Sequence, residues 1–382
     1  MPRPARPPAA RPDPSGDGAS RSGAAHAAIL GTGRALPSLA VPSSALDAEL
    51  GLEAGRLEAL TGVRTRYRCA RGEDQITLGT KAARLALADA ALGVDAIDCV
   101  ISAAAVPWQS IPSTAPAMMA ALGMADGSAR AFDVNATCLG FLVALDCADA
   151  MIATGRVRHV LVICADLASR ALPWRERPDV AGLFGDGAAA AVVGAASAGM
   201  RAMPQDDAGH DTDRDTGGSG RADGPRFVAH LLETRPGSHD ACQLGAGGTR
   251  YDYHADPALF EAHSRFRMDG RELFRVTAEH FPPFVERLLA RAGWRVDEVD
   301  RVVPHQASPL ALRHMARGCG FAPSRIVDIA SEVGNQVAAS LPFALDCARR
   351  GERAASRIEP GSRVLMLGTS AGVSFGGTAY VA

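Results

Sequence analysis

The chain has 382 residues, a formal net charge of −2 at pH 7 and an apolar content of 47%. With 40 glycines and 5% aromatic residues, this composition is typical of a soluble α/β protein, long enough for one large domain or two core-forming halves. Basic residues are scattered, which argues against a nucleic-acid partner, and no apolar run reaches the length of a membrane span.

The first segment in chain order, residues 1–25, is rich in Pro, Arg and Ala and lacks an apolar signal core. We expect a disordered tail there; a transit peptide is the alternative, although its prolines would interrupt an amphipathic helix. The eight cysteines fall at irregular spacings without a Cys-x-x-Cys pair. That pattern argues against a zinc site and a disulfide framework, so we expect a cytoplasmic protein with no bound metal.

Two series of predicted elements follow, in halves at residues 26–195 and 227–382. In the first half, periodicity predicts helices and strands in alternation, at 78–92 (helix), 99–106 (strand), 112–122 (helix), 130–135 (strand), 138–154 (helix) and 159–164 (strand). The second half repeats that order, at 272–292 (helix), 300–304 (strand), 308–318 (helix), 325–329 (strand), about 340–350 (helix) and 363–367 (strand). Residues 196–226, dense in Gly, Asp and Arg, are expected to form a flexible linker. Its His210 and aspartates are potential metal ligands, but a charged loop explains them more simply.

Short matches between the halves indicate a duplicated unit. VDAIDCV resembles VDEVDRV 202 positions later, ALDCA recurs 200 positions later, and RHVLVICAD resembles SRVLMLGTS 204 positions later. Each match is weak alone, and chance similarity in an alanine-rich chain is the alternative, but all three keep the same order at a nearly constant offset.

The predicted helix at 138–154 is apolar nearly all round, which is typical of a helix enclosed between two sheets. Its counterpart is apolar from Val337 to Leu345, and Pro342 predicts a helix start near Ser340 or a kink. Alternating strands and helices favour largely parallel sheets. We therefore predict a five-layer αβαβα fold built from two pseudo-symmetric halves around two buried central helices.

Cys138 lies where the first half changes from strand to buried helix, with Thr137 just before it. Free N–H groups and the macrodipole at a helix start favour an anion. They predict a lowered pKa and a nucleophilic thiolate for Cys138. A buried structural cysteine is the alternative for this residue and the preferred interpretation for Cys99, Cys147, Cys164 and Cys347.

Two residues of the second half are candidate partners of Cys138. His305 follows a predicted buried strand, and Asn335 lies at the position equivalent to Asn135. Each alone is explained by a structural role, as a satisfied histidine or as a turn residue after a glycine. Under the repeat, however, Cys138, His305 and Asn335 all meet at carboxyl ends of strands, where α/β folds place ligands.

In these motifs the chain resembles the β-ketoacyl-acyl-carrier-protein synthase III enzymes of the thiolase superfamily. The motifs are DVNATCLGF (133–141), LFGDGAAAAVV (183–193), FRMDGRELFR (266–275), PHQAS (304–308), GNQVAASLP (334–342) and GTSAGVSFGG (368–377). The resemblance implies that Cys138 accepts an acyl group from a thioester. A malonyl thioester then loses CO2, and its carbanion attacks the acyl-cysteine. It also implies that His305 and Asn335 stabilise the malonyl oxygen, and that backbone N–H groups of Cys138 and Ala371 form a second oxyanion hole.

The resemblance further implies coenzyme A or phosphopantetheine thioesters as substrates, an acyl carrier protein as partner, no tightly bound cofactor, and a homodimer with a continuous intersubunit sheet. Arg56 and Leu60 replace a tryptophan and an arginine common in the family at the coenzyme A site, and Leu310 replaces an arginine often used for carrier docking. These departures leave the acyl donor open. Arg275 is a candidate phosphate ligand, with a solvated surface arginine as its alternative.

Four functions other than condensation are compatible with parts of this sequence. A dinucleotide-binding dehydrogenase is disfavoured because the GTG at 31–33 lacks the third glycine and the acidic ribose contact. A cysteine hydrolase would use the same residue types, and a non-catalytic chain-length partner would have lost the nucleophile. An acyltransferase of secondary metabolism that keeps Cys138, His305 and Asn335 without condensation is the alternative that the sequence leaves open.

Overall fold

The computed structural model describes residues 27–196, 224–352 and 356–382. The predicted tail and nearly all of the predicted linker lie outside these residues. Two mixed sheets form the frame. The first has the strand order β1 (Ala27–Ala35), β7 (Gly187–Ala195), β6 (His159–Asp166), β4 (Cys99–Ser102), β5 (Arg130–Asp133). The second has the order β8 (Arg226–Thr234), β13 (Ser374–Val381), β12 (Arg363–Ser370), β11 (Arg301–Pro304).

The two sheets share one strand order, as the predicted duplication requires. β1 corresponds to β8, β7 to β13, β6 to β12 and β4 to β11, in sequence as well as in space. The fifth position, filled by β5 in the first sheet, is reduced in the second to a single parallel bridge between Val302 and Ile326. The internal repeat is therefore a real feature of the fold.

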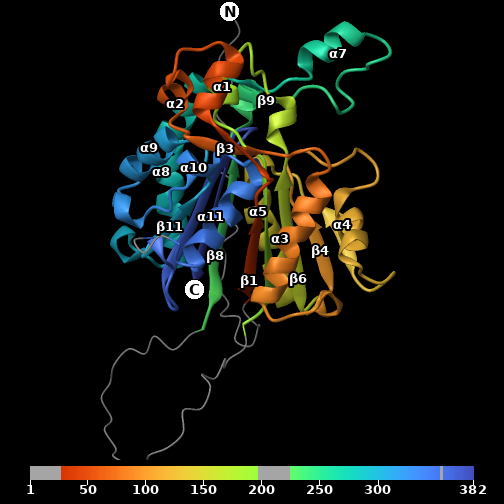
Figure 1. The fold of residues 1–382 in the computed structure, drawn as a ribbon. Helices are drawn as coiled ribbons and strands as arrows, with labels where there is room; N and C mark the ends of the chain where they lie inside the picture. The colour runs from red at the N-terminus through yellow and green to blue at the C-terminus, as the bar shows by residue number, and fades with distance from the viewer. Residues whose placement is uncertain (1–26, 197–223, 353–355) are drawn as a thin grey trace, which may run out of the picture.

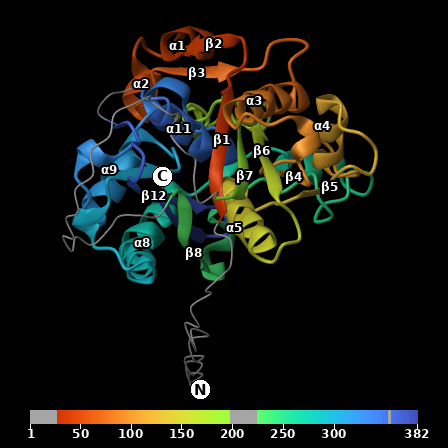
Figure 2. The same ribbon diagram turned by 90° about the horizontal axis from the view of Figure 1, so that it is seen from below.

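Six long helices complete five layers (Figures 1 and 2). Helices α3 (Gln75–Asp89) and α4 (Thr114–Leu122) cover the outer face of the first sheet. Helix α8 (Gly270–Ala292) covers the outer face of the second, with α9 (Pro309–Gly318) packed on α8. Helices α5 (Gly140–Ala153) and α11 (Ser340–Arg349) lie between the sheets. The predicted αβαβα architecture is confirmed.

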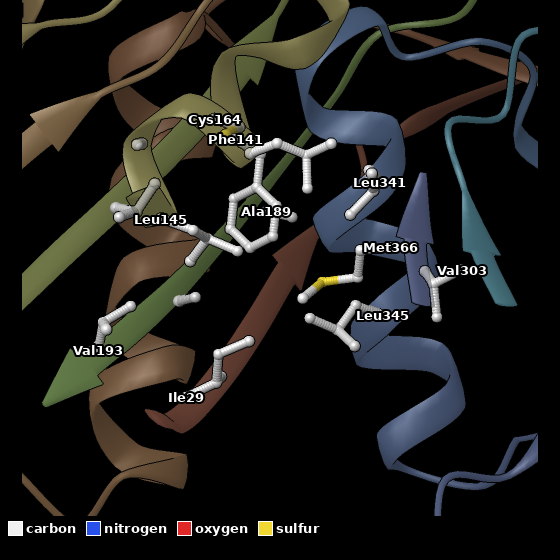
Figure 3. Packing of buried hydrophobic residues seen from close by; sticks show 14 of the residues in the cluster. Ile29, Phe141, Leu145, Cys164, Ala189, Val193, Val303, Leu341, Leu345 and Met366 are labelled. Atoms are coloured by element: carbon white, nitrogen blue, oxygen red, sulfur yellow. The ribbon is translucent and has the colours of Figure 1, made fainter. Parts of the chain in front are cut away.

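The central layer shows why the two buried helices are apolar. Phe141 and Leu145 of α5 share one buried cluster with Leu341 and Leu345 of α11 and with Met366 of β12 (Figure 3). Full burial of side chains of this size stabilises a fold by roughly 1.5–3 kcal/mol each. Helix α11 begins at Ser340, as predicted from the proline at the third helical position, where its missing N–H group leaves no hydrogen bond unmade.

The expectation of largely parallel sheets is wrong. Parallel pairing joins β4 to β5, β4 to β6 and β11 to β12, whereas β1, β7, β13 and β8 all pair antiparallel with their neighbours. Periodicity did not identify these four strands of the two main sheets. The alanine-rich β7, for example, is buried along almost its whole length, and a short continuous apolar run does not distinguish strand from helix.

The strand predicted at 325–329 is also wrong. Backbone groups of this segment form hydrogen bonds with one side chain, so the segment does not pair with a strand along its length. The buried Gln306 donates from Nε2 to the carbonyl of Val327 at 3.0 Å and accepts from the N–H of Ile329 at 2.9 Å. A 3₁₀ turn, η6 (Pro323–Arg325), and a short helix, α10 (Ala330–Val333), flank it. The side-chain amide thus takes the place of a neighbouring strand.

Shorter elements cover one end of the layers, at the top of Figure 1. They are β2 (Leu39–Pro42), α1 (Ser43–Leu50), α2 (Arg56–Thr61), β3 (Thr65–Arg68), α6 (Pro178–Ala181), β9 (Cys242–Gln243), α7 (Pro257–His263) and β10 (Arg267–Met268). Further 3₁₀ turns are η1 (Val94–Ala96), η3 (Ala168–Ala171), η4 (Pro236–Ala241) and η5 (Val296–Glu298). Across the described ranges, none of the helices combines the length and the apolar character that crossing a membrane requires.

Candidate active site

Two 3₁₀ turns occupy equivalent places in the two halves. They are η2 (Thr137–Leu139), which leads into α5, and η7 (Val337–Ala339), which leads into α11. Thr137 has φ of 48° and Val337 has φ of 53°, a left-handed conformation that is rare for β-branched residues. In each turn the asparagine two residues earlier accepts a hydrogen bond from that strained residue's N–H, at 3.1 Å and 2.8 Å. The two halves therefore share the same strained turn. Backbone strain of this kind concentrates at functional sites.

Cys138 lies in η2, directly after the strained Thr137. Strand β5 ends at Asp133, so the strand is shorter and the connection to Cys138 longer than predicted, and the α-helix starts only at Gly140. The lowered pKa expected for Cys138 is wrong. Burial raises the pKa of this thiol far above its ordinary value, and the charges of Cys242 and Asp166 raise it further. Desolvation outweighs the favourable field of the helix start.

The raised pKa of Cys138 has a testable consequence for the alkylation of its thiol. Because the thiolate is the reactive form, the rate of Cys138 alkylation by iodoacetamide should still increase between pH 8 and pH 9.5. A cysteine with the lowered pKa expected from the sequence would instead react at a constant rate in this range. Peptide mass spectrometry after brief labelling would measure the rate at Cys138 separately from those at the other cysteines. A plateau below pH 8 would contradict the burial argument.

His305 is the first residue after β11 and is 5% exposed. Its N–H donates to the carbonyl of Leu367 in β12 at 2.7 Å, which fixes the backbone at the carboxyl end of the sheet. Burial lowers the pKa of His305 to about 4 from an ordinary value of 6.5, so the imidazole is neutral at pH 7. As the pH falls, the imidazole of His305 is protonated in the unfolded chain before it is protonated in the fold. Its contribution therefore lowers the free energy of unfolding as the pH falls from about 6.5 to about 4.

Asn335 is held by its backbone and by one end of its side chain. Its N–H donates to the carbonyl of Leu183 at 2.8 Å, and it forms an isolated parallel bridge with Phe184. Its Oδ1 accepts from the N–H of Val337 at 2.8 Å and from the hydroxyl of Ser340 at 3.3 Å. The carbonyl end of the amide is thus occupied, and Nδ2 is the group left to donate to another molecule.

Packing brings the three segments together. Turn η2 contacts both η7 and β12, and β12 pairs in parallel with β11, which ends next to His305. Gly368 of β12 lies between the two sides: a Cβ added there would stand 2.8 Å from Cδ2 of Leu139 and 3.1 Å from Cβ of His305. Gly368 therefore packs against His305 and against Leu139, the neighbour of Cys138, while η7, which follows Asn335, contacts η2.

Gly368→Ala should consequently lower activity. The added methyl group must displace Leu139 or His305, and a shift of about 1 Å near reacting groups can lower a rate by roughly a hundredfold. We expect a decrease in kcat of about tenfold or more, measured by steady-state kinetics. Gly270→Ala is the control, because a Cβ there would find its nearest atom at 3.9 Å. Equal kinetics of the two variants would contradict the close packing around Gly368.

Ala371 lies half-buried in the turn that joins β12 to β13. The neighbouring Ser370 donates its hydroxyl to the carbonyl of Ala371 at 3.1 Å, and Gly372 has φ of 114°, which a residue with a Cβ rarely adopts. The turn therefore follows the same carboxyl end of the second sheet as His305.

Arg275 lies apart from these residues, on the exposed part of α8. Its side chain is 59% exposed and pairs with Glu272 at 2.7 Å and Glu279 at 3.3 Å. Two surface cavities, of about 670 and 380 Å³, lie near this region, and neither is lined by Cys138, His305 or Asn335. Within the described part of the chain, no three His, Cys, Asp or Glu side chains are grouped so that they could hold a metal ion.

Two polar residues that support the site were not identified from the sequence. Gln306 holds the segment between β11 and α10, and Asp166 accepts hydrogen bonds from backbone N–H groups of both halves. The signal for Gln306 was present, because it stands in the PHQAS motif beside His305. For Asp166 the only sequence signal is a carboxylate at the end of a buried apolar strand, which normally lacks charge.

Comparisons with known proteins agree with this geometry. Residues 132–206 match the family 3-Oxoacyl-[acyl-carrier-protein (ACP)] synthase III, and residues 289–381 match its C-terminal family. The β-ketoacyl-[acyl-carrier-protein] synthase III of Rhizorhabdus wittichii is 34% identical, over 93% of this chain and 98% of the relative. The crystal structure of the Pseudomonas aeruginosa 3-oxoacyl-(acyl carrier protein) synthase III is 29% identical with a TM-score of 0.76, over 93% and 98% of the two chains. A priming β-ketosynthase of a polyketide pathway is 25% identical with a TM-score of 0.78, over 94% and 97%.

A thiolase-like fold of two pseudo-symmetric halves, shared with synthase III structures, defines a condensing enzyme of the acyltransferase class. The chain belongs to the β-ketoacyl-[acyl-carrier-protein] synthase III family. The resemblance inferred from the motifs is thereby confirmed. The first family match contains Cys138, and the second contains His305, Asn335 and Ala371.

Proposed function

We propose that Cys138 is the nucleophile of a decarboxylative condensation. Its sulfur attacks the carbonyl carbon of an acyl thioester, the donor's C–S bond breaks, and the donor thiol leaves with the proton of Cys138. The product is an acyl-enzyme. The raised pKa of Cys138 means that the proton leaves as the substrate arrives, rather than from a standing thiolate.

In the second half-reaction a malonyl thioester loses its carboxylate as CO2. The bonding electrons pass into the thioester, which becomes an enolate with negative charge on its oxygen. A neutral, buried His305 and the Nδ2 of Asn335 are suited to donate hydrogen bonds to that oxygen. The enolate carbon then attacks the acyl-cysteine, and the C–S bond to Cys138 breaks to give a 3-oxoacyl thioester. The released Cys138 sulfur takes up a proton from water, which restores the thiol.

The tetrahedral intermediates at Cys138 also need a donor pair for their oxygen. We assign this role to the backbone N–H groups of Cys138 and Ala371. Both lie in turns that follow the carboxyl end of a strand, where N–H groups are free of sheet pairing. In this scheme the half at residues 26–195 supplies the nucleophile, and the half at 227–382 supplies the two donors for decarboxylation.

The proposed substrates are acyl thioesters of coenzyme A or of the phosphopantetheine of an acyl carrier protein, with malonyl carrier protein as the extender. A homodimer and a cytoplasmic location are part of the same proposal. The proposal also includes Arg275 as a phosphate ligand. A phosphate at Arg275 must compete with the carboxylates of Glu272 and Glu279. Arg56 and Leu60, at positions where relatives commonly contact coenzyme A, favour a test of both kinds of donor.

The observation that carries this proposal is that η2 contacts both η7 and β12, with Gly368 of β12 packed between Leu139 and a buried, neutral His305. The test incubates the purified protein with radiolabelled acyl-CoAs and acyl carrier proteins of increasing chain length, with and without malonyl carrier protein. Without malonyl carrier protein we expect labelled protein, and with malonyl carrier protein we expect labelled 3-oxoacyl product. Labelled protein that never yields a ketoacyl product would favour the plain acyltransferase instead.

A further inference from the structure

Asp166 is a buried carboxylate that the proposed mechanism does not use. It is the last residue of β6 and is 2% exposed. Its Oδ1 accepts from the N–H groups of Ala105 at 3.0 Å and Val106 at 3.4 Å, and its Oδ2 accepts from the N–H of Ala338 at 3.0 Å. Among the described residues, neither Arg nor Lys forms an ion pair with it. Burial raises the pKa of Asp166 to about 7, and the backbone N–H groups from both halves oppose this shift by stabilising the ionised form.

Ala338 is the counterpart of Cys138. Both are the second residue of their 3₁₀ turns, both follow a β-branched residue with positive φ, and they lie 200 positions apart. The N–H of Ala338 is therefore equivalent to the N–H that we assign to the oxyanion hole at Cys138. In the second half that N–H already donates to a side-chain oxygen of the protein, Oδ2 of Asp166.

The other half lacks this carboxylate. Strand β12, the counterpart of β6, ends at Ser370, as β6 ends at Asp166. Ser370 donates its hydroxyl to the carbonyl of Ala371 and brings no charge to η2. Within the described ranges, the N–H of Cys138 donates to no other residue, and its partner is the sulfur of its own side chain. Of the two equivalent anion holes, one is filled by the protein and the other is free for substrate.

We propose that Asp166 is a positioning residue that fills the anion hole of the second half and thereby holds η7 and Asn335 in place for decarboxylation. The mechanical reason is the strain at Val337, which stands between Asn335 and Ala338. A β-branched residue at positive φ relaxes unless its neighbours are fixed. The bond from Ala338 to Asp166 fixes one side, and the bond from Val337 to Oδ1 of Asn335 fixes the other. This inference rests on the proposed function of Asn335.

Asp166→Asn tests the role with little change of shape. Oδ1 can still accept from the N–H groups of Ala105 and Val106, but an NH2 group now faces the N–H of Ala338, so that bond is lost. The substitution also removes a charge that raises the pKa of Cys138, so we expect acyl-enzyme formation at or above the wild-type rate. Decarboxylation of a malonyl thioester by the pre-acylated enzyme should decrease about a hundredfold, the effect of a displacement of roughly 1 Å.

Asp186→Asn is the matched control. Asp186 is equally buried, but its carboxylate accepts from Cys69 and Ser169 and not from η7. Labelled acyl transfer, CO2 release and thermal unfolding are measured for both variants. We expect a selective loss of CO2 release for Asp166→Asn only. Equal losses in both half-reactions, a loss shared with Asp186→Asn, or no loss at all would overturn the proposal.

A second substitution introduces a carboxylate in the other half, so its outcome does not depend on the stability of Asp166 variants. Ser370→Asp places a carboxylate where the first anion hole lies and should cap the N–H of Cys138. Acyl-enzyme formation should then decrease about a hundredfold, as when one oxyanion-hole donor is removed. Ser370→Asn, of the same size and without charge, should lose much less. Equal rates for the two Ser370 variants would overturn the equivalence of the two holes.

The wild-type protein in the same assays separates this inference from the proposed function. If wild type forms no acyl-enzyme or no condensation product, the proposed function fails. If wild type does both and the Asp166 and Ser370 variants behave like their controls, only the inference about Asp166 fails.

Discussion

Cys138→Ala is expected to abolish acyl-enzyme formation and to lower the condensation rate by about 10⁶-fold, the loss seen when a catalytic nucleophile is removed. No other group in the proposed mechanism can carry the acyl chain, so the reaction cannot be divided into two easier steps. The measurement is labelled acyl-CoA bound to protein after denaturation, followed by peptide mapping. Cys138→Ser should also remain unlabelled, because a hydroxyl is far less acidic than a thiol.

The matched control is Cys147→Ala. Cys147 lies in α5, nine positions after Cys138, and is half-buried. Burial raises its pKa too, so a general difference in thiol reactivity would affect both residues. We expect the Cys147 variant to be acylated as wild type is. Persistent labelling of the Cys138 variant, or loss of labelling with Cys147→Ala, would move the nucleophile elsewhere.

The parts of the fold that could be predicted are those in which sequence pattern and packing coincide. Helix α5 is apolar on all sides because sheets lie on both of its faces, and Pro342 marks the first turn of α11. The repeat could be recognised from the sequence because equivalent positions of the two halves lie in the same structural environment. Even the strained residues, Thr137 and Val337, lie at equivalent positions.

What the sequence could not provide depends on groups brought together from afar. The segment at 325–329 has the composition of a strand, but Gln306 takes its backbone partners. The pKa of Cys138 depends on burial and on the charges of Cys242 and Asp166, which are distant in sequence. The candidate site residues were proposed from their motifs, whereas their protonation states depend on the folded environment.

Asn335→Asp is expected to show the second large effect, a selective loss of decarboxylation. The new carboxylate can still accept from the N–H of Val337 and the hydroxyl of Ser340, so the turn is retained. It no longer donates, however, and it places negative charge where charge develops on the malonyl oxygen. Loss of one such donor lowers kcat by about 10²–10³-fold, and the repulsion adds to this. Acylation of Cys138 should be affected much less, because its oxygen faces other donors.

The pseudo-symmetry of the chain supplies the control for this prediction. Asn135 has the same local geometry, with Oδ1 accepting from the N–H of Thr137 at 3.1 Å, but one hydrogen of its Nδ2 is used in a bond to the carbonyl of Ala105, and the proposed mechanism gives it no substrate contact. Asn135→Ser keeps a hydroxyl acceptor for Thr137 and should retain CO2 release. His305→Ala should resemble Asn335→Asp, with acylation retained and decarboxylation lost. If both asparagine variants lose CO2 release equally, the two halves do not divide the chemistry, and Asn335 acts only through the backbone turn that it shares with Asn135.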